Sequence, residues 1–322
     1  MVASFMTTQS NWRDLRDTFP WVKAFNDTIR TLPLPIFQGK EIIIGTDSSG
    51  SHQQNPFEVF GIVIFDLDSS HRWEVLRQEI RRELLTDSRR MAFKKLGDKI
   101  RQRALEPFLL AADQMNGLCL SVAVNKQINL LGGGTEVHDQ LKRDGKLKAQ
   151  WTPDSFARMA RVTQFVSLMV AGLCSEGQNV YWISDEDEMF ESPIKTGDTL
   201  QLLSAFRHMF IKWPLGKFSA GTTKLDNGDR FEEDFAAIAD LAAGALGELV
   251  MKIQKDCGGC LLEANIELPL SLSNKSDVLL QWLMDTSKSL KRASLIFDQR
   301  LDGKFRVGKF WSEDSLLKCG AI

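Results

Sequence analysis

The sequence has little cysteine and no long apolar run. Its five cysteines, an odd number dispersed along 322 residues, argue against a disulfide framework. No stretch approaches the roughly 20 consecutive apolar residues that are needed to cross a bilayer. The first residues are polar and charged, where a signal peptide would carry its apolar segment. We therefore expect a cytoplasmic protein without a membrane-spanning segment.

Several common catalytic motifs are also absent. The three consecutive glycines within residues 127–150 lack the spacing of a dinucleotide-binding or phosphate-binding loop. No nucleophile elbow or serine-centred triad is recognisable. Cys257 and Cys260 have the spacing of a metal or redox pair, but a structural zinc site needs four ligands and no second pair exists. His52 could carry a proton, although a histidine in a surface turn is more common.

The residues that are present favour a folded α/β protein. Hydrophobic residues make up 43% and charged residues 25% of the chain, which suits one large core or two smaller cores. Period-two and period-3.6 patterns alternate along the chain and predict a mixed sheet flanked by helices. The expected strands are 41–47, 57–66, 89–96 (RRMAFKKL, weakly), 118–126, 179–184 and about 215–225. The expected helices are 11–31, 72–85, 97–116, 153–175, 197–212 and 232–253.

The tail from about residue 261 predicts one further helix, at 276–291, and two strands. We divide the chain into an N-terminal helical segment (1–35), a central domain (36–258) and an appended C-terminal subdomain (259–322) with an α+β extension. Residues 127–150 are glycine-rich and polar, which predicts a mobile excursion.

Three aspartates lie on separate elements of this expected fold. Asp47 follows a run of three isoleucines, Asp185 directly follows the strand 179–184, and Asp240 lies on the long helix 232–253. Asp240 falls opposite the apolar stripe of its helix, on a face made of small residues. These small neighbours are Ala236, Ala243, Gly244 and Gly247. Such a face indicates close approach by another backbone or by a ligand, because a solvent face normally carries better helix formers.

Clustered carboxylates repel one another unless a cation neutralises them, and their hard oxygens suit Mg²⁺ or Mn²⁺. Two-metal phosphodiester hydrolysis uses such a site. Two of these features also have a plainer interpretation when taken alone: Asp47 as a turn former and the acidic run after residue 184 as a solvated loop. Asp240 is the hardest to explain in this way, because of its small-residue face. The ordered set of three favours a metal site over these alternatives.

The motifs GTDSSG, FGIVIFD, MAFKKLGD, VYWISDEDE and AAIADLAAGA, in this order, resemble a family of bacterial and phage domains of unknown function, the 3800 family, which has a ribonuclease-H-like fold. The resemblance covers roughly residues 40–255. It implies that Asp47, Asp185 and Asp240 bind metal, with Lys94 and Lys95 in the position of a lysine-bearing motif.

One residue departs from the family pattern. The family carries a glutamate after its first aspartate, where this chain has Ser48, which puts full catalytic competence in doubt. The extra acids Glu186, Asp187 and Glu188 could compensate, with Asp187 as an additional metal ligand.

A basic stretch precedes the fourth motif. Between Arg77 and Arg103 there are ten Lys or Arg residues against four acids, although the whole chain has a net charge of -2. Such a stretch either binds a polyanion or forms a solvated helix surface. As candidate contacts for nucleic acid we take Arg81, Arg82, Arg89, Arg90, Lys94 and Lys95.

Two functions follow from these patterns. The first is a metal-dependent nuclease that hydrolyses phosphodiester bonds of DNA or RNA, with Asp47, Asp185 and Asp240 as catalytic residues. The second is a catalytically degraded ribonuclease-H-like subunit of a larger nucleic-acid or defence-type assembly, with a protein partner or a second copy of itself. Eight tryptophans and 20 phenylalanines could supply such an interface.

Overall fold

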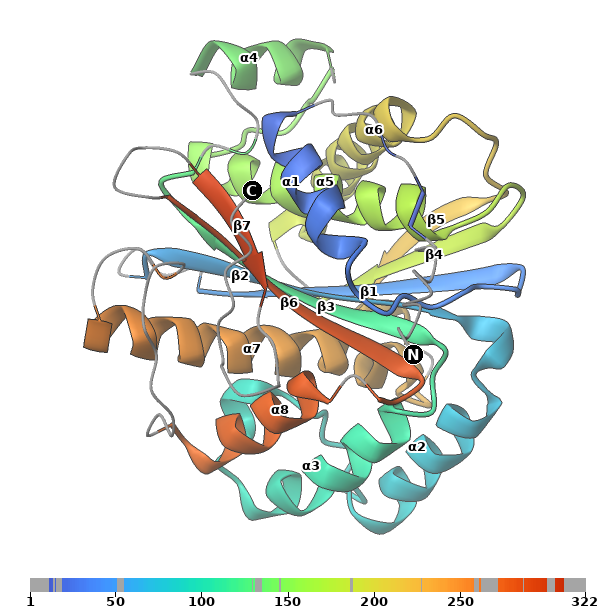
Figure 1. Ribbon diagram of the computed structural model, residues 1–322. Helices are drawn as coiled ribbons and strands as arrows, with labels where there is room; N and C mark the ends of the chain where they lie inside the picture. The colour runs from blue at the N-terminus through green and yellow to red at the C-terminus, as the bar shows by residue number, and fades with distance from the viewer. Residues whose placement is uncertain are drawn as a thin grey trace, which may run out of the picture.

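The computed structural model describes residues 12, 13, 15, 19–50, 55–128, 130, 135–144, 146–185, 188–226, 228–257, 261, 272–285, 287–299 and 305–309. Figure 1 shows three layers: a central sheet with α1, α4, α5 and α6 on one side and α2, α3, α7 and α8 on the other. The helices are α1 Pro20–Ile29, α2 His71–Glu83, α3 Lys99–Ala112, α4 Thr135–Asp144, α5 Pro153–Leu173, α6 Pro193–Phe210, α7 Phe231–Cys257 and α8 Asn274–Met284. Short 3-10 turns are η1 Leu67–Ser69, η2 Phe93–Lys95, η3 Glu188–Phe190 and η4 Thr223–Leu225.

The sheet has seven strands in the order β5-β4-β1-β2-β3-β6-β7. The strands are β1 Glu41–Ser49, β2 Phe57–Asp66, β3 Gly117–Asn125, β4 Asn179–Ser184, β5 Phe218–Thr222, β6 Leu290–Gln299 and β7 Phe305–Lys309. β2 is antiparallel to both neighbours, β1 and β3, whereas β1, β4 and β5 are mutually parallel. β1 and β4 therefore bring their carboxyl ends to one edge of the sheet. This is the mixed sheet, led by an antiparallel hairpin and flanked by helices, that the sequence predicts for a ribonuclease-H-like class.

Hydrophobic clusters on both faces of the sheet hold the layers together. On one face, Phe165 of α5 packs among Trp21 and Phe25 of α1 and Phe297 of β6. On the other face, a second cluster joins the sheet to α2, α3, α7 and α8. β2 is buried along its whole length because helices cover both of its faces.

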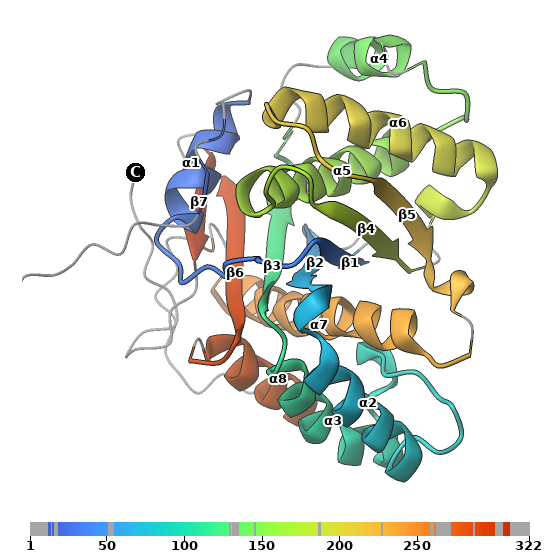
Figure 2. The ribbon, with the colours of Figure 1, turned by 90° about the vertical axis from the view of Figure 1, so that its right-hand side faces the viewer.

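α7 lies against the centre of the sheet, as Figure 2 shows, at a distance that two glycines permit. A Cβ on Gly61 would overlap the carbonyl oxygen of Ala239, and a Cβ on Gly45 would press on the ring of Phe235. The helix backbone therefore contacts the strand backbone at Gly61, which a side chain there would prevent.

The sequence predictions hold for most elements and fail in four places. The helix expected at 276–291 ends at Met284, and β6 begins at Leu290. The first helix begins at Pro20 rather than at residue 11, consistent with the preference of proline for the first helical turn. Residues 93–95 form the turn η2, so the expected strand in RRMAFKKL is wrong. Residues 135–144 within the expected excursion form the helix α4. Among the described residues, no helix has both the length and the apolarity needed to cross a membrane.

The C-terminal extension is built onto the same sheet. β6 runs parallel to β3, β7 pairs antiparallel with β6, and α8 packs on α7. The α+β character of the extension is confirmed in its described part. The three-part division of the chain, with boundaries at 35 and 258, stays a prediction.

Candidate functional site

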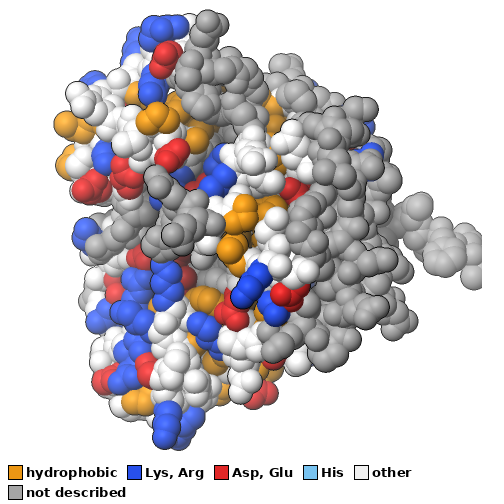
Figure 3. All heavy atoms as spheres, turned by 90° about the vertical axis from the view of Figure 1, so that its left-hand side faces the viewer, with side chains coloured by type: hydrophobic (Ala, Val, Ile, Leu, Met, Phe, Trp, Pro, Cys, Tyr) orange, Lys and Arg blue, Asp and Glu red, His pale blue; other side chains and the backbone are white. Residues whose placement is uncertain are grey.

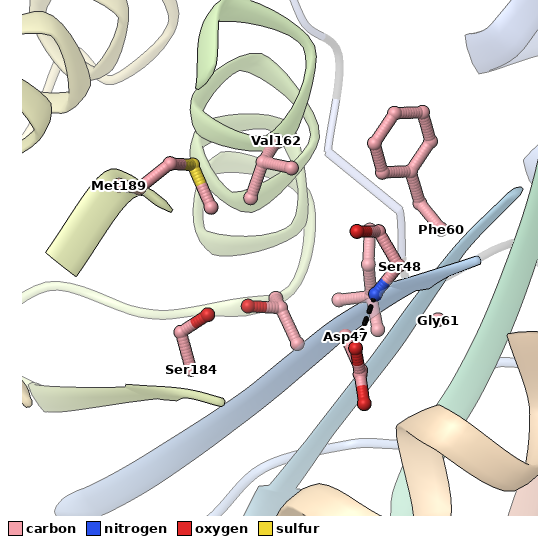
Figure 4. A pocket seen from close by; sticks show the side chains of 9 residues that line it. Asp47, Ser48, Phe60, Gly61, Val162, Ser184 and Met189 are labelled. Carbon is pink, nitrogen blue, oxygen red and sulfur yellow. Dashed lines mark hydrogen bonds between the residues drawn. The ribbon is translucent and has the colours of Figure 1, made fainter. Parts of the chain in front are cut away.

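Asp47 lies within β1, two residues before the strand ends, directly opposite Gly61 of β2. Its side chain points to the face covered by α7 (Figure 4), and its Oδ1 accepts a hydrogen bond of 2.6 Å from the backbone N–H of Ser48. Burial, and then the charges of Asp240 and Asp185, raise the pKa of Asp47 from 3.8 to about 8. The Ser48 N–H and the charge of Arg90 oppose this rise only in part.

Asp240 approaches from α7, on the helix face that the sequence singles out for its small residues. Its Oδ2 accepts a hydrogen bond of 2.7 Å from the backbone N–H of Phe93, in η2. A Cβ on Gly244 would overlap the Phe93 ring, so the small face admits this neighbouring segment. Burial raises the pKa of Asp240, and the Phe93 N–H and the Arg90 charge lower it less. The close approach inferred from the sequence is thus confirmed as approach by another backbone.

Asp185 follows the last residue of β4, and a cation holds it. Both nitrogens at the end of the Arg90 guanidinium contact its carboxylate, with Nη1 to Oδ1 at 3.1 Å. The Thr223 hydroxyl donates a further hydrogen bond of 3.2 Å to Oδ1. The contact with Asp185 raises the pKa of Arg90, so this residue stays charged.

The fold therefore brings the three predicted aspartates to one place, where they act on one another electrostatically. Their ligand atoms do not, however, all lie within 4.8 Å of one another in the described structure. The Arg90 contact with Asp185 and the Phe93 contact with Asp240 orient two of the carboxylates toward other partners. The three carboxylates therefore do not have the arrangement expected around a shared cation.

The neighbouring acidic residues do not join this group in the described structure. Glu188 accepts hydrogen bonds from Ser155 and from Lys195 at 3.1 Å, in η3 and away from Asp47. The predicted ligand Asp187, and Glu186, lie outside the described residues. A supplementary carboxylate from this run therefore stays a prediction for Glu186 and Asp187.

Ser48 occupies the opposite face of the sheet from Asp47, because side chains alternate along a strand. Figure 4 shows it beside a small hollow lined by Phe60, Val162 and Met189, with Ser184 nearby. Within this hollow Thr46 accepts a hydrogen bond of 2.9 Å from Trp182 Nε1. The side chain of a glutamate at position 48 would begin at this hollow, on the face away from α7. Ser48 in place of the family glutamate therefore does not remove a carboxylate from the face covered by α7.

The basic stretch is largely engaged in ion pairs within the protein. Arg81 binds the buried carboxylate of Asp234, together with Arg77 at 3.2 Å. Arg89 contacts Asp87 and Asp98. Figure 3 shows Lys and Arg side chains in the lower half of one face, with Asp and Glu among them.

Three of the predicted nucleic-acid contacts remain exposed to solvent. Arg82 pairs with its neighbour Glu83 at 3.2 Å, and both side chains are more than 60% exposed. Lys94 and Lys95 are exposed on η2, and the charge of Lys94 acts on Asp240. For a polyanion, these three cations are more accessible than Arg81, Arg89 and Arg90.

Sequence reasoning missed three contributors to the site. The backbone N–H of Phe93 and the hydroxyl of Thr223 have no sequence signal, because any residue supplies an N–H and threonine is common in turns. Arg90 was expected to contact phosphate, and its pairing with Asp185 depends on residues 95 positions apart in the chain. In the sequence, the small residue Gly244 indicates the close approach that Phe93 makes.

A second acidic group lies at the start of α7. Ligand atoms of Asp226, Asp229 and Glu232 lie within 4.8 Å of one another. Asp226 accepts hydrogen bonds of 2.9 Å from the backbone N–H groups of Gly228 and Arg230. Negative charge is favoured at a helix N-terminus, so a capping role accounts for this group.

Comparisons with known proteins give low similarity. No protein family matches the sequence, and no curated protein does. Among solved structures, ribonuclease H2 from Pyrococcus horikoshii OT3 has 12% sequence identity and a TM-score of 0.35, over 76% of this chain and 86% of that chain. Ribonuclease HII from Archaeoglobus fulgidus, solved in complex with PCNA, has 14% identity and a TM-score of 0.34, over 78% and 93% of the two chains.

Proposed function

We propose that the protein is a metal-dependent nuclease that hydrolyses phosphodiester bonds of nucleic acid at the Asp47–Asp185–Asp240 site. One observation carries this proposal: two half-buried carboxylates from different elements, Asp47 and Asp240, have raised pKa values, and the Asp47 pKa is raised partly by its acidic neighbours. A protein gains no stability from such an arrangement, so function is the better explanation.

The donor set fits a hard divalent cation. Asp47, Asp240 and, after rotation, Asp185 would present carboxylate oxygens, which are the ligands that Mg²⁺ and Mn²⁺ prefer. A bound ion would supply an activated water and stabilise charge on the leaving oxygen. Asp187 is a candidate additional ligand from the loop after β4.

The surrounding cations have separate roles in this proposal. Arg90 neutralises Asp185 while no metal is bound, and it orients that carboxylate. Lys94 and Lys95 are placed to contact backbone phosphates beside Asp240, because both are exposed on η2. The resemblance of the motifs to the 3800 family supports the same assignment of aspartates and lysines.

A second candidate is a catalytically degraded binding subunit in a larger assembly. The contact between Arg90 and Asp185 favours it, because a guanidinium already neutralises one of the three carboxylates. Such a subunit would bind nucleic acid or a protein partner without hydrolysis.

Cleavage assays distinguish the two functions. Labelled single-stranded and double-stranded DNA, RNA and hybrid are incubated with the protein in Mn²⁺, Mg²⁺ or EDTA. We expect cleavage that requires the metal and that falls at least about a hundredfold in Asp47→Asn, with Asp285→Asn as the control for a carboxylate outside the site. Binding without cleavage on every substrate and with both metals would establish the subunit instead.

Nucleic-acid binding is tested separately through its salt dependence. Replacing Lys94 and Lys95 together by Gln should weaken binding and reduce the slope of log K against log salt by about one to two units. The matched control replaces Lys99 and Arg103, two exposed cations of α3, by Gln. Equal losses in both double variants would mean that the whole basic surface acts without a preferred site.

A further inference from the structure

The segment Phe93–Lys95 is held from two sides. On one side, the Phe93 N–H donates to Asp240 at 2.7 Å, and the Phe93 ring lies against the bare backbone at Gly244. On the other side, the ammonium of Lys275 donates to the Phe93 carbonyl at 3.2 Å and lies 4.0 Å from the centre of its ring. One residue of η2 thus connects a candidate metal ligand with a cation of α8.

Lys275 belongs to the C-terminal extension, and α7 fixes its position. The Ser273 N–H, just before α8, donates to Glu248 of α7 at 3.1 Å. The Ser273 hydroxyl also bonds to the hydroxyl of Ser276 at 3.1 Å. The first turn of α8 is therefore attached to the helix that carries Asp240, and Lys275 extends from that turn.

The contacts of Lys275 are of a kind that restrains a backbone. A hydrogen bond from a charged donor to a carbonyl is stronger than one from a neutral donor, and an ammonium over an aromatic ring adds a cation–π attraction. η2 itself has a single turn, and its buried neighbours Met91, Ala92 and Leu96 also anchor it. The segment therefore depends on side-chain contacts for its position.

We propose that Lys275 is a positioning residue: it holds the Phe93–Lys95 segment so that the Phe93 N–H orients Asp240 and the two lysines lie beside the carboxylates. The importance of this position for metal binding rests on the proposed function. The role makes the C-terminal extension part of the site, although no residue of the extension contacts the aspartates directly among the contacts described.

The test uses the full-length protein with Lys275→Met, the conservative variant Lys275→Arg, and the control Lys252→Met. Lys252 is on α7 and pairs with Asp256 at 2.9 Å. Hydrogen exchange of the Phe93 amide, measured by NMR in EDTA, should become about tenfold faster in Lys275→Met. Lys275→Arg should restore slow exchange, and Lys252→Met should leave it unchanged.

The second measurement is the Mn²⁺ dissociation constant, by calorimetry, with the denaturation midpoint of each variant. We expect Lys275→Met to weaken Mn²⁺ binding about tenfold with an unchanged midpoint, as for residues that orient metal ligands. Unchanged Phe93 exchange in Lys275→Met would overturn the proposal. A lower midpoint with an unchanged Mn²⁺ constant would also overturn it, because Lys275 would then be only structural.

The two proposals fail in different ways. If the wild-type protein neither binds Mn²⁺ nor cleaves nucleic acid, the proposed function is wrong. Phe93 exchange still decides whether Lys275 positions the segment, since that measurement uses no metal and no substrate.

Discussion

Replacing Asp47 by Asn should stabilise the metal-free protein, and the gain should grow with pH. The folded-state pKa of Asp47 is about 8 and its ordinary value is 3.8, so the native state holds a proton that the unfolded chain releases between these values. The contribution of protonated Asp47 to the stability of the wild type is fully present below about pH 4 and is lost as the pH rises through 8. Asn has no proton to lose and is not subject to this loss.

The magnitude follows from the size of the shift. One pKa unit corresponds to about 1.4 kcal/mol, so the shift from 3.8 to about 8 sets a ceiling of roughly 6 kcal/mol at high pH. Asp47 is partly exposed, and solvent and the Arg90 charge reduce the repulsion. We therefore expect a gain of about 1–2 kcal/mol at pH 8 and close to none at pH 4.

Urea denaturation in EDTA at pH 5 and pH 8 measures this gain directly. Asp285→Asn is the control of opposite sign, because hydrogen bonds from Ser287 lower the pKa of Asp285. That substitution should cost stability at both pH values. A stability change for Asp47→Asn that is unfavourable at pH 8, or equal at both pH values, would refute the reasoning from repulsion.

Three further predictions concern the same site. Asp240→Asn keeps an acceptor for the Phe93 N–H, so its melting temperature should equal or exceed that of the wild type, and Mn²⁺ should raise it less. A lower melting temperature that Mn²⁺ raises as much as in the wild type would show that Asp240 has only a structural role. Arg90→Gln should lower the free energy of unfolding by about 1–2 kcal/mol in EDTA, because Asp185 loses its counter-ion. Mn²⁺ should stabilise this variant more than the wild type; equal stabilisation would show that Arg90 does not act at the site. The affinity of the wild type for Mn²⁺ should rise by up to about tenfold per pH unit between pH 6 and 8, because the metal displaces a proton. Calorimetry in two buffers measures both the affinity and the proton release; an affinity that does not change with pH would exclude Asp47 as a ligand.

The sequence predicts the fold well where periodicity is strong. The apolar runs of β1 and β2 and the long stripe of α7 indicate their elements and most of their ends. Asp240 and its small neighbours also indicate a close approach, which the Phe93 segment makes. These features are local, so spacing along the chain is enough to recognise them.

The remaining features depend on contacts between distant segments. The short apolar stretch around Met91 has the pattern of a strand, yet its residues anchor η2 to the core. The pairing of Arg90 with Asp185 has no local pattern, and the charge run around it suggests a free surface. Tertiary ion pairs therefore decide which basic residues remain available to a ligand, and a single sequence does not contain that information.

The contact between Gly61 and Ala239 has a consequence for how the site can be altered. Gly61 is the cross-strand partner of Asp47, and Ala239 directly precedes Asp240. The separation of these two aspartates is therefore determined by backbone packing rather than by their own side chains. Gly61→Ala would act as a spacer, moving α7 by on the order of 1 Å and changing the fit of the site to ions of different radius while every candidate ligand stays in place.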